Sequence, residues 1–494
     1  MGKKDKSEIE EKKVKIKKEK VRKEKKVKPA KDKPAKVKVK KVKPIKVVKV
    51  KKEKTKSVKV RQEKVRREAG YSASVPGWYK LDNAAKIYPA TMRRDWNSVA
   101  RISVTLDKDI KVEKLRAAVA DLRPRFPSFF VVLRKGFFWH YLEPADSLDI
   151  VSEECEYPCR AFPVGTGNKP LFRILYYKNR ISMEFFHSIT DGFGAVAFIK
   201  SLVYRYLELC GFAMSDPKGE VLKHCDDPLT PEFEDGFMKY YQKVKAKRPK
   251  EPIAYQHRKP RSNDYKYFRV ITGSFLVDEL RKITKEKGVT ITQYLTALLI
   301  LSIAKDITGT PVRTRRPVRI SVPINLRKLF PSTTLRNFSL FVNAGLQISK
   351  DITIDDILAS VCPQLVDGFE KENIRDAFCH NVKPEKNVVV KVVPLFIKNF
   401  IVRMVSKSVG ESRFTASFSN MGVVDMPECM RGYVKDIGMV IGPSPNNGIN
   451  LVGSSYGDRM TMTFSSCFPD TAVQKYFFYY LSELGVNVEV ETNV

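Results

Sequence analysis

The sequence contains one short motif whose residue types could carry out proton transfer. His187, Asp191 and Gly192 form the pattern H-x-x-x-D-G. Histidine has an unperturbed pKa of about 6.5, which suits acid–base catalysis near neutral pH. The Asp191 carboxylate can cap a helix, and Gly192 permits a tight turn and a close helix approach. Taken alone, His187 could also be a structural histidine beside a helix N-terminus.

The residues on both sides of the motif predict rigid elements. Apolar runs at 171–177 and 181–186, separated by a polar tripeptide, predict a hairpin of two strands. After the motif, apolar residues at helical spacing predict a helix from about residue 195 to 207, with Gly211 as its stop signal. His187 would therefore lie in a loop between a strand and a helix, which hold its side chain in place.

The rest of the chain predicts two α+β halves. Its 494 residues exceed the roughly 250–300 at which a single core stops growing. A polar, proline-punctuated connector at 214–262 separates a first half, 71–260, from a second, 261–494. Further helices are predicted at 111–122, 277–287, 290–305 and 471–484. Further strands are predicted at 129–133, 137–142, 265–276, 318–323, 338–348, 413–419, 448–455 and 460–467.

Residues 1–70 form a basic tail. They contain 32 Lys and Arg but only 10 Asp and Glu, so they supply +22 of the net charge of +36. The tail has no aromatic residue, which predicts disorder rather than a packed core. It is either a solubilising extension or a weak contact to a polyanion, such as nucleic acid or an anionic membrane surface.

Two apolar stretches raise the question of a membrane. Residues 290–304 are too few to span a bilayer and predict a helix that is buried on all sides. Residues 388–407 are interrupted by Pro394, beyond which apolar and basic residues are interleaved. Such an amphipathic helix can rest on a membrane or pack against the protein's own core. We favour the core and expect no transmembrane segment.

The cysteines and the first residues indicate a reducing compartment. None of the eight cysteines forms a C-x-x-C pair, which predicts reduced thiols in the core rather than a disulfide framework or a zinc site. No apolar segment of a secretory signal follows the first lysines. We therefore expect a cytoplasmic protein without a bound metal.

Five segments together resemble the CoA-dependent acyltransferase superfamily. This group includes chloramphenicol acetyltransferase, plant BAHD acyltransferases, alcohol acetyltransferases, wax ester synthases and the condensation domains of peptide synthetases. The H-x-x-x-D-G motif resembles its active-site motif, and four further segments follow the superfamily's order. They are L-R-P-R-F-P-S-F at 122–129, V-P-I-N-L-R at 322–327, N-F-S-L-F-V-N at 337–343 and F-S-N-M-G-V-V at 418–424. The resemblance covers residues 71–494 and fits alcohol acetyltransferases and wax ester synthases best.

This resemblance implies a fold and a reaction. The fold would be α+β, with two chloramphenicol-acetyltransferase-like subdomains, each a mixed β-sheet with packed helices, and an active-site channel between them. The reaction would move an acyl group from acyl-CoA, the co-substrate, to a small alcohol or amine without a bound cofactor. His187 would be the general base, while Asp191 and Gly192 would hold its loop in place.

Further residues receive roles only through the resemblance. Ser419, Asn420 and Asn343 are candidates for substrate contact or for donors to the oxyanion, although backbone and turn roles are equally open for them. Arg327 is the expected salt-bridge partner of Asp191. Phe186 stands where many condensation domains carry a second histidine, which weakens assignment to peptide synthesis. The D-F-G-W-G segment of BAHD enzymes is also missing.

Two alternatives stay open from the sequence. The first is a non-catalytic binding protein with the acyltransferase fold, tethered by its basic tail to nucleic acid or a membrane. The second is a condensation-like enzyme that takes acyl groups from a carrier protein. The acyl chain length, the acceptor and the oligomeric state are not encoded in these motifs, because the first two depend on the shape of the channel.

Overall fold

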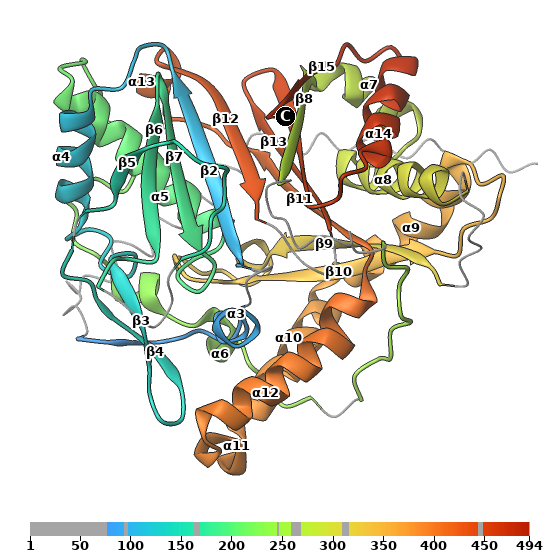
Figure 1. Ribbon diagram of the computed structural model, residues 1–494, viewed down its shortest axis with the longest axis horizontal. Coiled ribbons are helices and arrows are strands. Elements are labelled where there is room, and N and C mark those ends of the chain that lie inside the picture. Colours follow the sequence, from blue (N-terminus) through green and yellow to red (C-terminus); the bar gives the residue numbers. More distant parts are fainter. Residues whose placement is uncertain are drawn as a thin grey trace, which may run out of the picture. The chain divides into compact units, whose positions relative to one another are not determined.

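The computed structural model shows a mixed α+β protein (Figure 1). The structure describes residues 77–92, 97–147, 149–162, 168–244, 247–257, 268–308, 316–442 and 448–493. They form two large mixed β-sheets and a small sheet, with helices packed against them. The α+β fold class predicted from the sequence is therefore confirmed, whereas the predicted basic tail at 1–70 lies outside the described residues.

The first large sheet has five strands in the order β12-β2-β7-β6-β5. These strands are β2 (Val99–Leu106), β5 (Val151–Glu153), β6 (Phe172–Tyr177), β7 (Arg180–Phe186) and β12 (Val434–Ile441). β6 and β7 form the predicted hairpin, and α4 (Val112–Leu122) packs on α5 (Gly192–Leu209). The apolar side chains of α5 recur at helical spacing, so Phe198, Leu202 and Tyr206 are buried in the core of this sheet.

The second large sheet has seven strands in the order β10-β9-β11-β13-β14-β8-β15. They are β8 (Arg269–Leu276), β9 (Val318–Asn325), β10 (Ser339–Leu346), β11 (Ala416–Val423), β13 (Ile449–Tyr456), β14 (Arg459–Ser466) and β15 (Glu489–Thr492). The helices that share an apolar core with it include α8 (Ile291–Thr308), α9 (Ile354–Gly368) and α14 (Ala472–Glu483). Residues 294–304 of α8 are buried throughout, which confirms the predicted buried helix.

One strand joins the two halves of the sequence. β12 comes after most of the chain, yet it pairs with β2 along its length. It also lies against β13 and β14, where the hydroxyls of Ser454 and Ser465 donate to the backbone carbonyls of Ile437 and Ile441. The two large sheets therefore meet here through hydroxyl groups rather than through apolar side chains alone. The predicted domain boundary between residues 260 and 261 stays a prediction.

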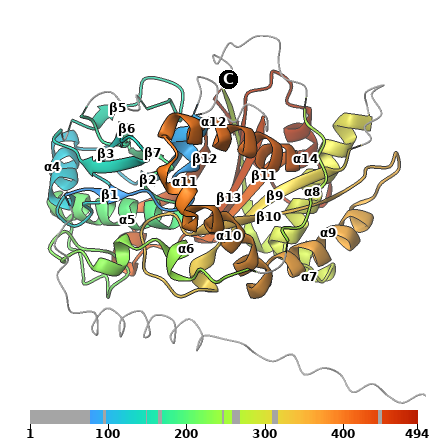
Figure 2. The ribbon, with the colours of Figure 1, turned by 90° about the horizontal axis from the view of Figure 1, so that it is seen from below.

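Shorter elements complete the described fold. β1 (Tyr79–Lys80), β3 (Val131–Lys135) and β4 (His140–Pro144) form the small sheet. The remaining helices are α3 (Ile87–Thr91), α6 (Gly236–Lys239), α7 (Val277–Glu286), α10 (Lys371–Lys386), α11 (Val388–Val392), α12 (Leu395–Val405) and α13 (Glu428–Arg431). Figure 2 shows α10, α11 and α12 grouped on the side seen from below. Within the described ranges no single helix is long and apolar enough to cross a bilayer, and α7 and α8, bent by 87°, pass that test only as a pair.

The helix beyond Pro394 is turned the opposite way from the prediction. Phe396 and Phe400 of α12 are 73% and 62% exposed, whereas Lys398 is only 7% exposed. The prediction that the apolar face of this helix packs on the protein's own core is therefore wrong. The lysine forms contacts with the body that the apolar residues do not, as described below.

The cysteines depart from the prediction in one respect. All eight carry free thiols, but only Cys159 and Cys379 are buried, while Cys155 and Cys225 are exposed. The other four, Cys210, Cys362, Cys429 and Cys467, are partly buried against the apolar cores, so the predicted core location is wrong only for Cys155 and Cys225. Their spacing in the sequence carries no information on burial, because none of them belongs to a paired motif.

Candidate active site

His187 is the first residue after β7, in the short loop that leads into α5. Its backbone N–H donates to the Ser98 carbonyl at 3.0 Å, and its own carbonyl accepts from Asn337 Nδ2 at 2.8 Å. The imidazole stacks on the ring of Tyr88, with centroids 5.1 Å apart, and meets the ring of Phe185 edge-on at 5.6 Å. These contacts hold the backbone and the ring plane of His187 in one orientation.

The surroundings of His187 favour its neutral form. Burial lowers the pKa of the imidazole below that of an exposed histidine, although the Asp191 carboxylate, the Asn337 side chain and the Thr190 backbone act in the opposite direction. Nδ1 is buried and has no hydrogen-bond partner among the described residues. A neutral imidazole keeps a lone pair on one nitrogen, so this ring can accept a proton at neutral pH.

Asp191 fixes the loop rather than the imidazole. Its Oδ1 accepts from the backbone N–H groups of Phe193 and Gly194 at 3.1 and 3.3 Å, which caps the N-terminus of α5. Its Oδ2 accepts from Arg327 Nη1 and from the Phe338 N–H, both at 2.8 Å. Both carboxylate oxygens are thus engaged by groups other than the ring, and they connect α5 to the second half of the chain.

The guanidinium of Arg327 is buried at this connection, with its side chain only 4% exposed. Besides the ion pair with Asp191, Nε donates to the Thr334 carbonyl at 3.0 Å and Nη2 donates to the Arg336 carbonyl. The guanidinium also lies over the Phe193 ring, 4.4 Å from its centroid. A planar group with several fixed donors suits this place, and a lysine could not replace these contacts.

Two glycines allow the loop to approach its neighbours closely. A Cβ on Gly194 would lie 2.1 Å from the Leu335 carbonyl oxygen and 2.2 Å from Thr190 Oγ1. A Cβ on Gly192 would lie 2.8 Å from Cε of Met421, the end of a flexible side chain. Gly194, which the sequence analysis did not select, is therefore the stricter requirement. Gly192 marks the place where the end of β11 meets the loop.

The two polar candidates on β11 lie on opposite faces of the second sheet, because side chains alternate along a strand. Asn420 shares the face of Phe418, which is in the apolar core, and its Nδ2 donates to Thr292 Oγ1 of α8 at 2.9 Å. Ser419 lies on the other face, away from the apolar core of this sheet. A β-bulge between Asn420 and Val423 ends the alternation, and Met421 within it reaches the loop. The structure therefore commits the Asn420 amide to α8, whereas a role of Ser419 at the site stays a prediction.

Asn343 on β10 is tied to the connector between the two halves. Its Nδ2 donates to Glu251 Oε2 at 2.9 Å, and its backbone carbonyl accepts from Arg319 Nη2 at 2.8 Å. Its Oδ1 is buried and has no hydrogen-bond partner within the described ranges. Part of the hydrogen-bonding capacity of this amide is thus already used to hold the connector against the sheet.

A buried polar network behind His187 is missing from the sequence predictions. Asp82 is fully buried, accepts from the N–H and the Nδ2 of Asn337 at 3.3 and 3.2 Å, and lies 3.7 Å from Arg336 Nε. Burial raises the pKa of Asp82 to about 6, although Arg336 acts in the opposite direction. Because Asn337 also donates to the His187 carbonyl, this network supports the loop from behind.

A cavity of about 780 Å³ lies beside this network. Leu81, Lys86, Trp139 and Arg336 are among the residues that line it. His187 is not one of its lining residues, so the channel expected around the imidazole stays a prediction. In the part of the chain that the structure describes, no group of three or more His, Cys, Asp or Glu side chains could hold a metal ion.

Solved structures share this fold. The TRI101 protein of F. sporotrichioides, complexed with coenzyme A and T-2, is 10% identical over 84% of this chain and 99% of that one, with a TM-score of 0.56. Polyketide synthase associated protein 5 from Mycobacterium tuberculosis is 14% identical over 82% of this chain and 97% of its own, with a TM-score of 0.52. The first condensation domain of the CDA synthetase is 12% identical over 83% of this chain and 97% of its own, with a TM-score of 0.51.

The chain therefore shares its fold with a protein crystallised with coenzyme A and with a condensation domain of a peptide synthetase, two kinds of protein to which the sequence resemblance pointed. No protein-family model and no curated protein sequence matches the chain. Identities of 10 to 14% establish a common fold and not a common reaction. The reaction has to be inferred from the residues around His187.

Proposed function

We propose that the protein is an acyltransferase that moves an acyl group from acyl-CoA to an alcohol or amine, with His187 as the general base. The observation that carries this proposal is that the His187 imidazole is held in one orientation in surroundings that favour its neutral form. Burial favours its neutral form, and Tyr88 and Phe185 hold it at the place where α5 meets the end of β11. The acyltransferase fold supports the same class of reaction.

The reaction needs one proton acceptor. Neutral His187 removes the proton from the acceptor's hydroxyl or amino group while that oxygen or nitrogen attacks the carbonyl carbon of the thioester. Negative charge then develops on the carbonyl oxygen of a tetrahedral intermediate. When the intermediate collapses, the carbon–sulfur bond breaks and the imidazolium returns the proton to the sulfur of CoA. The products are the acylated acceptor and free CoA, and no acyl group is attached to the protein.

Ser419 is the proposed donor to the oxyanion. Ser419 lies on the face of β11 opposite the apolar core of the second sheet, whereas the amides of Asn420 and Asn343 bond to other parts of the protein. A donor aimed at the developing charge contributes more in a water-poor site than in bulk water. Asp191 and Arg327 act as positioning residues, because their contacts hold the loop and not the substrate.

The test is the release of thiol from acetyl-CoA and longer acyl-CoAs across a panel of alcohols and amines. His187→Ala should lower turnover by about 10²–10⁴-fold, the usual contribution of a positioned base. His380→Ala, which removes a histidine of α10, is the matched control and should leave turnover unchanged. Equal turnover of wild type and His187→Ala would contradict the mechanism.

The same assay separates the two alternatives. Transfer from an acylated carrier protein, but not from free acyl-CoA, would select a condensation-like enzyme. An absence of transfer from either donor, together with binding of the full chain to nucleic acid or vesicles, would select a non-catalytic protein. Release of CoA from acyl-CoA that depends on the acceptor would select the proposed acyltransferase.

A further inference from the structure

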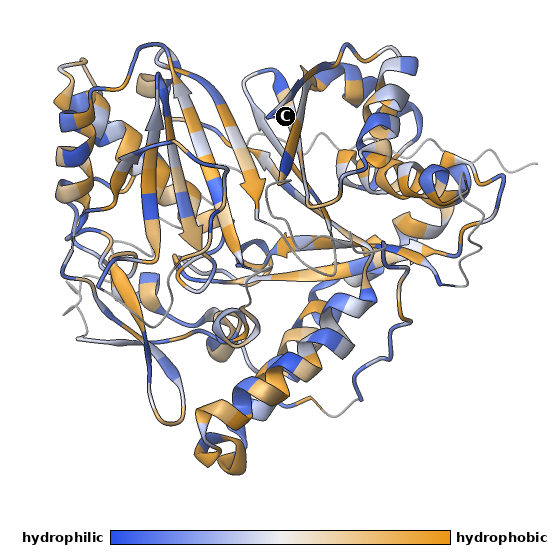
Figure 3. Ribbon diagram, viewed as in Figure 1, coloured by the Kyte–Doolittle hydropathy of each residue, from blue (hydrophilic) through white to orange (hydrophobic). Residues whose placement is uncertain are grey.

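Helices α11 and α12 are rich in apolar residues (Figure 3), and many of their side chains, with those of the loop between β3 and β4, are exposed. Soluble proteins rarely expose a contiguous apolar patch of this kind unless it contacts a partner or a membrane. The residues of this surface are Phe137, Phe138, Val388, Val389, Val392, Phe396, Ile397, Phe400, Ile401, Met404 and Val405, which are between 39% and 73% exposed. We call this set the apolar surface.

The orientation of α12 is set by its polar side. Lys398 Nζ donates to the carbonyls of Phe138 and Lys391 at 3.0 and 3.1 Å and lies 3.5 Å from the centroid of the Trp139 ring. On the next turns, Arg403 Nε donates to the Ala90 carbonyl of α3 at 2.5 Å. Lys398 is thereby buried against the body, while Arg403 reaches α3 and stays exposed, so the apolar residues of the helix face outward.

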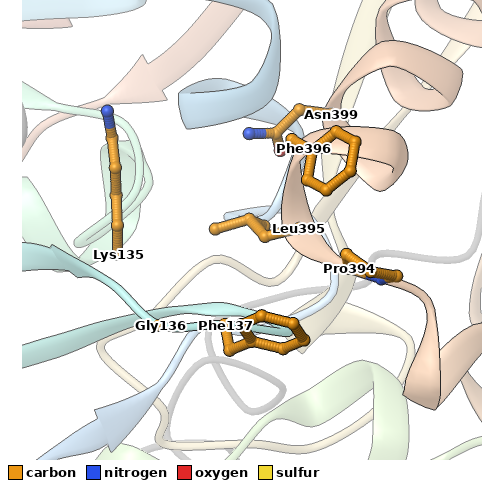
Figure 4. A pocket seen from close by; sticks show the side chains of 7 residues that line it. All are labelled: Lys135, Gly136, Phe137, Pro394, Leu395, Phe396 and Asn399. Carbon is orange, nitrogen blue, oxygen red and sulfur yellow. The ribbon is translucent and has the colours of Figure 1, made fainter.

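The hairpin loop and α12 form one continuous surface. The Leu395 N–H donates to the Phe137 carbonyl at 2.9 Å, and the rings of Phe137 and Phe138 lie 4.8 Å apart. A crevice of about 340 Å³ lies between the loop and the start of α12. Figure 4 shows Phe137 and Leu395 on either side of it, with Phe396 and Lys135 at its edges. These contacts hold the hairpin loop and α12, the two parts of the apolar surface, against each other.

The charges in the segment that carries most of the apolar surface have one sign. Between residues 386 and 410 the chain has five cations and no Asp or Glu. Four of these cations are exposed: Lys386, Lys391, Arg403 and Lys407. Lys135, beside the hairpin loop, is exposed as well. Apolar residues bordered by cations match the interface of an anionic bilayer, where acyl chains lie beneath negative headgroups. A second copy of this surface would bring like charges together, which disfavours a symmetric dimer.

We propose that the apolar surface is a membrane-docking surface that inserts into the headgroup region of a bilayer containing anionic lipids. The phenylalanines and valines enter the boundary between headgroups and acyl chains, and the bordering lysines contact the lipid phosphates. The protein rests on the membrane and does not cross it. This inference does not depend on the activity of His187 and extends beyond the proposed function.

The direct test uses the full chain with a tryptophan reporter in the apolar surface. Phe396→Trp is mixed with vesicles of phosphatidylcholine and phosphatidylserine whose acyl chains carry bromine. Measured as the difference from wild type, which has three tryptophans of its own, the reporter emission should shift to shorter wavelength and be quenched. Tyr479→Trp, at a site on α14 that is 55% exposed, is the matched control and should show neither change. Equal responses of the two variants, or no response of Phe396→Trp, would overturn the proposal.

Salt and a double substitution separate the apolar surface from the basic tail. At about 1 M salt, where the Debye length is about 3 Å, the contribution of the tail is largely screened. Vesicle sedimentation of Phe396→Ser/Phe400→Ser should then be at least about a hundredfold weaker than that of wild type, since burying each ring contributes roughly tenfold. The control Tyr476→Ser/Tyr479→Ser should bind like wild type.

Two further outcomes would also overturn the proposal. A shift in the emission of Phe396→Trp that follows protein concentration without vesicles would assign the apolar surface to self-association. Equal binding at low salt to vesicles of phosphatidylcholine alone and to vesicles with phosphatidylserine would show that the bordering cations do not select an anionic surface.

Discussion

The His187 loop and the end of β11 meet at Gly192 and Met421, but they use their polar side chains differently. Asp191 of the loop and Asn337 behind it satisfy backbone groups and leave the imidazole held mainly by ring contacts. On β11, the Asn420 amide is itself committed to α8. The comparison shows what leaves a polar side chain free for chemistry. His187 is free because other side chains bond the backbone around it, whereas the Asn420 amide is used in a structural hydrogen bond.

The largest effect on stability is expected from breaking the ion pair that holds the loop. Arg327→Met leaves the Asp191 carboxylate buried without its cation, so the free energy of unfolding should fall by about 3–5 kcal/mol. Urea denaturation measures this change. The double variant Arg327→Met/Asp191→Asn removes the orphaned charge and should recover part of the loss. Wild-type stability in the single variant would show that the ion pair does not hold the loop.

The next largest effects are expected for Ser419 and Asn420 of β11, which should differ in whether they change kcat or stability. Ser419→Ala should lower kcat by about 10²–10³-fold with little change in stability, because it removes the proposed oxyanion donor. Asn420→Ala should lower the free energy of unfolding by about 1 kcal/mol, because it removes a structural hydrogen bond, and kcat should change by less than roughly tenfold. Steady-state kinetics and urea denaturation are measured on both variants. A large loss of kcat only in Asn420→Ala would assign the donor to that residue instead.

The smallest effect compares the two glycines of the loop. Gly194→Ala forces a methyl group against a backbone carbonyl, so the free energy of unfolding should fall by about 1–3 kcal/mol. Gly192→Ala meets only the end of the Met421 side chain, and a change of less than about 1 kcal/mol is expected. Thermal unfolding of the two variants checks the order. A greater loss in Gly192→Ala would contradict the packing described here.

The sequence predicts elements whose signals are local. The hairpin of β6 and β7 and the helix α5 follow from alternation and helical spacing within about twenty residues, and both are present. The partner of β12 is β2, which lies in the other half of the chain, and no local pattern identifies such a pairing. The seven-stranded order of the second sheet is unpredictable for the same reason.

The residues of the candidate site likewise fall into those that a local motif predicts and those that only the fold brings together. His187, Asp191 and Gly192 belong to one hexapeptide, and the resemblance supplied Arg327 as the ion-pair partner that lies 2.8 Å from the carboxylate. Tyr88 and Asp82 reach the loop only through folding, and neither belongs to any motif in the sequence. The helical spacing of α12 correctly predicted an apolar face, but its predicted direction toward the core was wrong, because the direction depends on the contacts of Lys398 with the hairpin loop.

The pH dependence of kcat/KM tests the role of His187 most directly. A base must be neutral to act, so activity should rise with pH through the pKa of the imidazole and level off near neutrality. Burial lowers that pKa, so the inflection should lie below the value of about 6.5 for an exposed histidine. In His187→Ala, activity should be about 10²–10⁴-fold lower and the inflection should be missing. The same inflection in wild type and His187→Ala would contradict the assignment of His187 as the base.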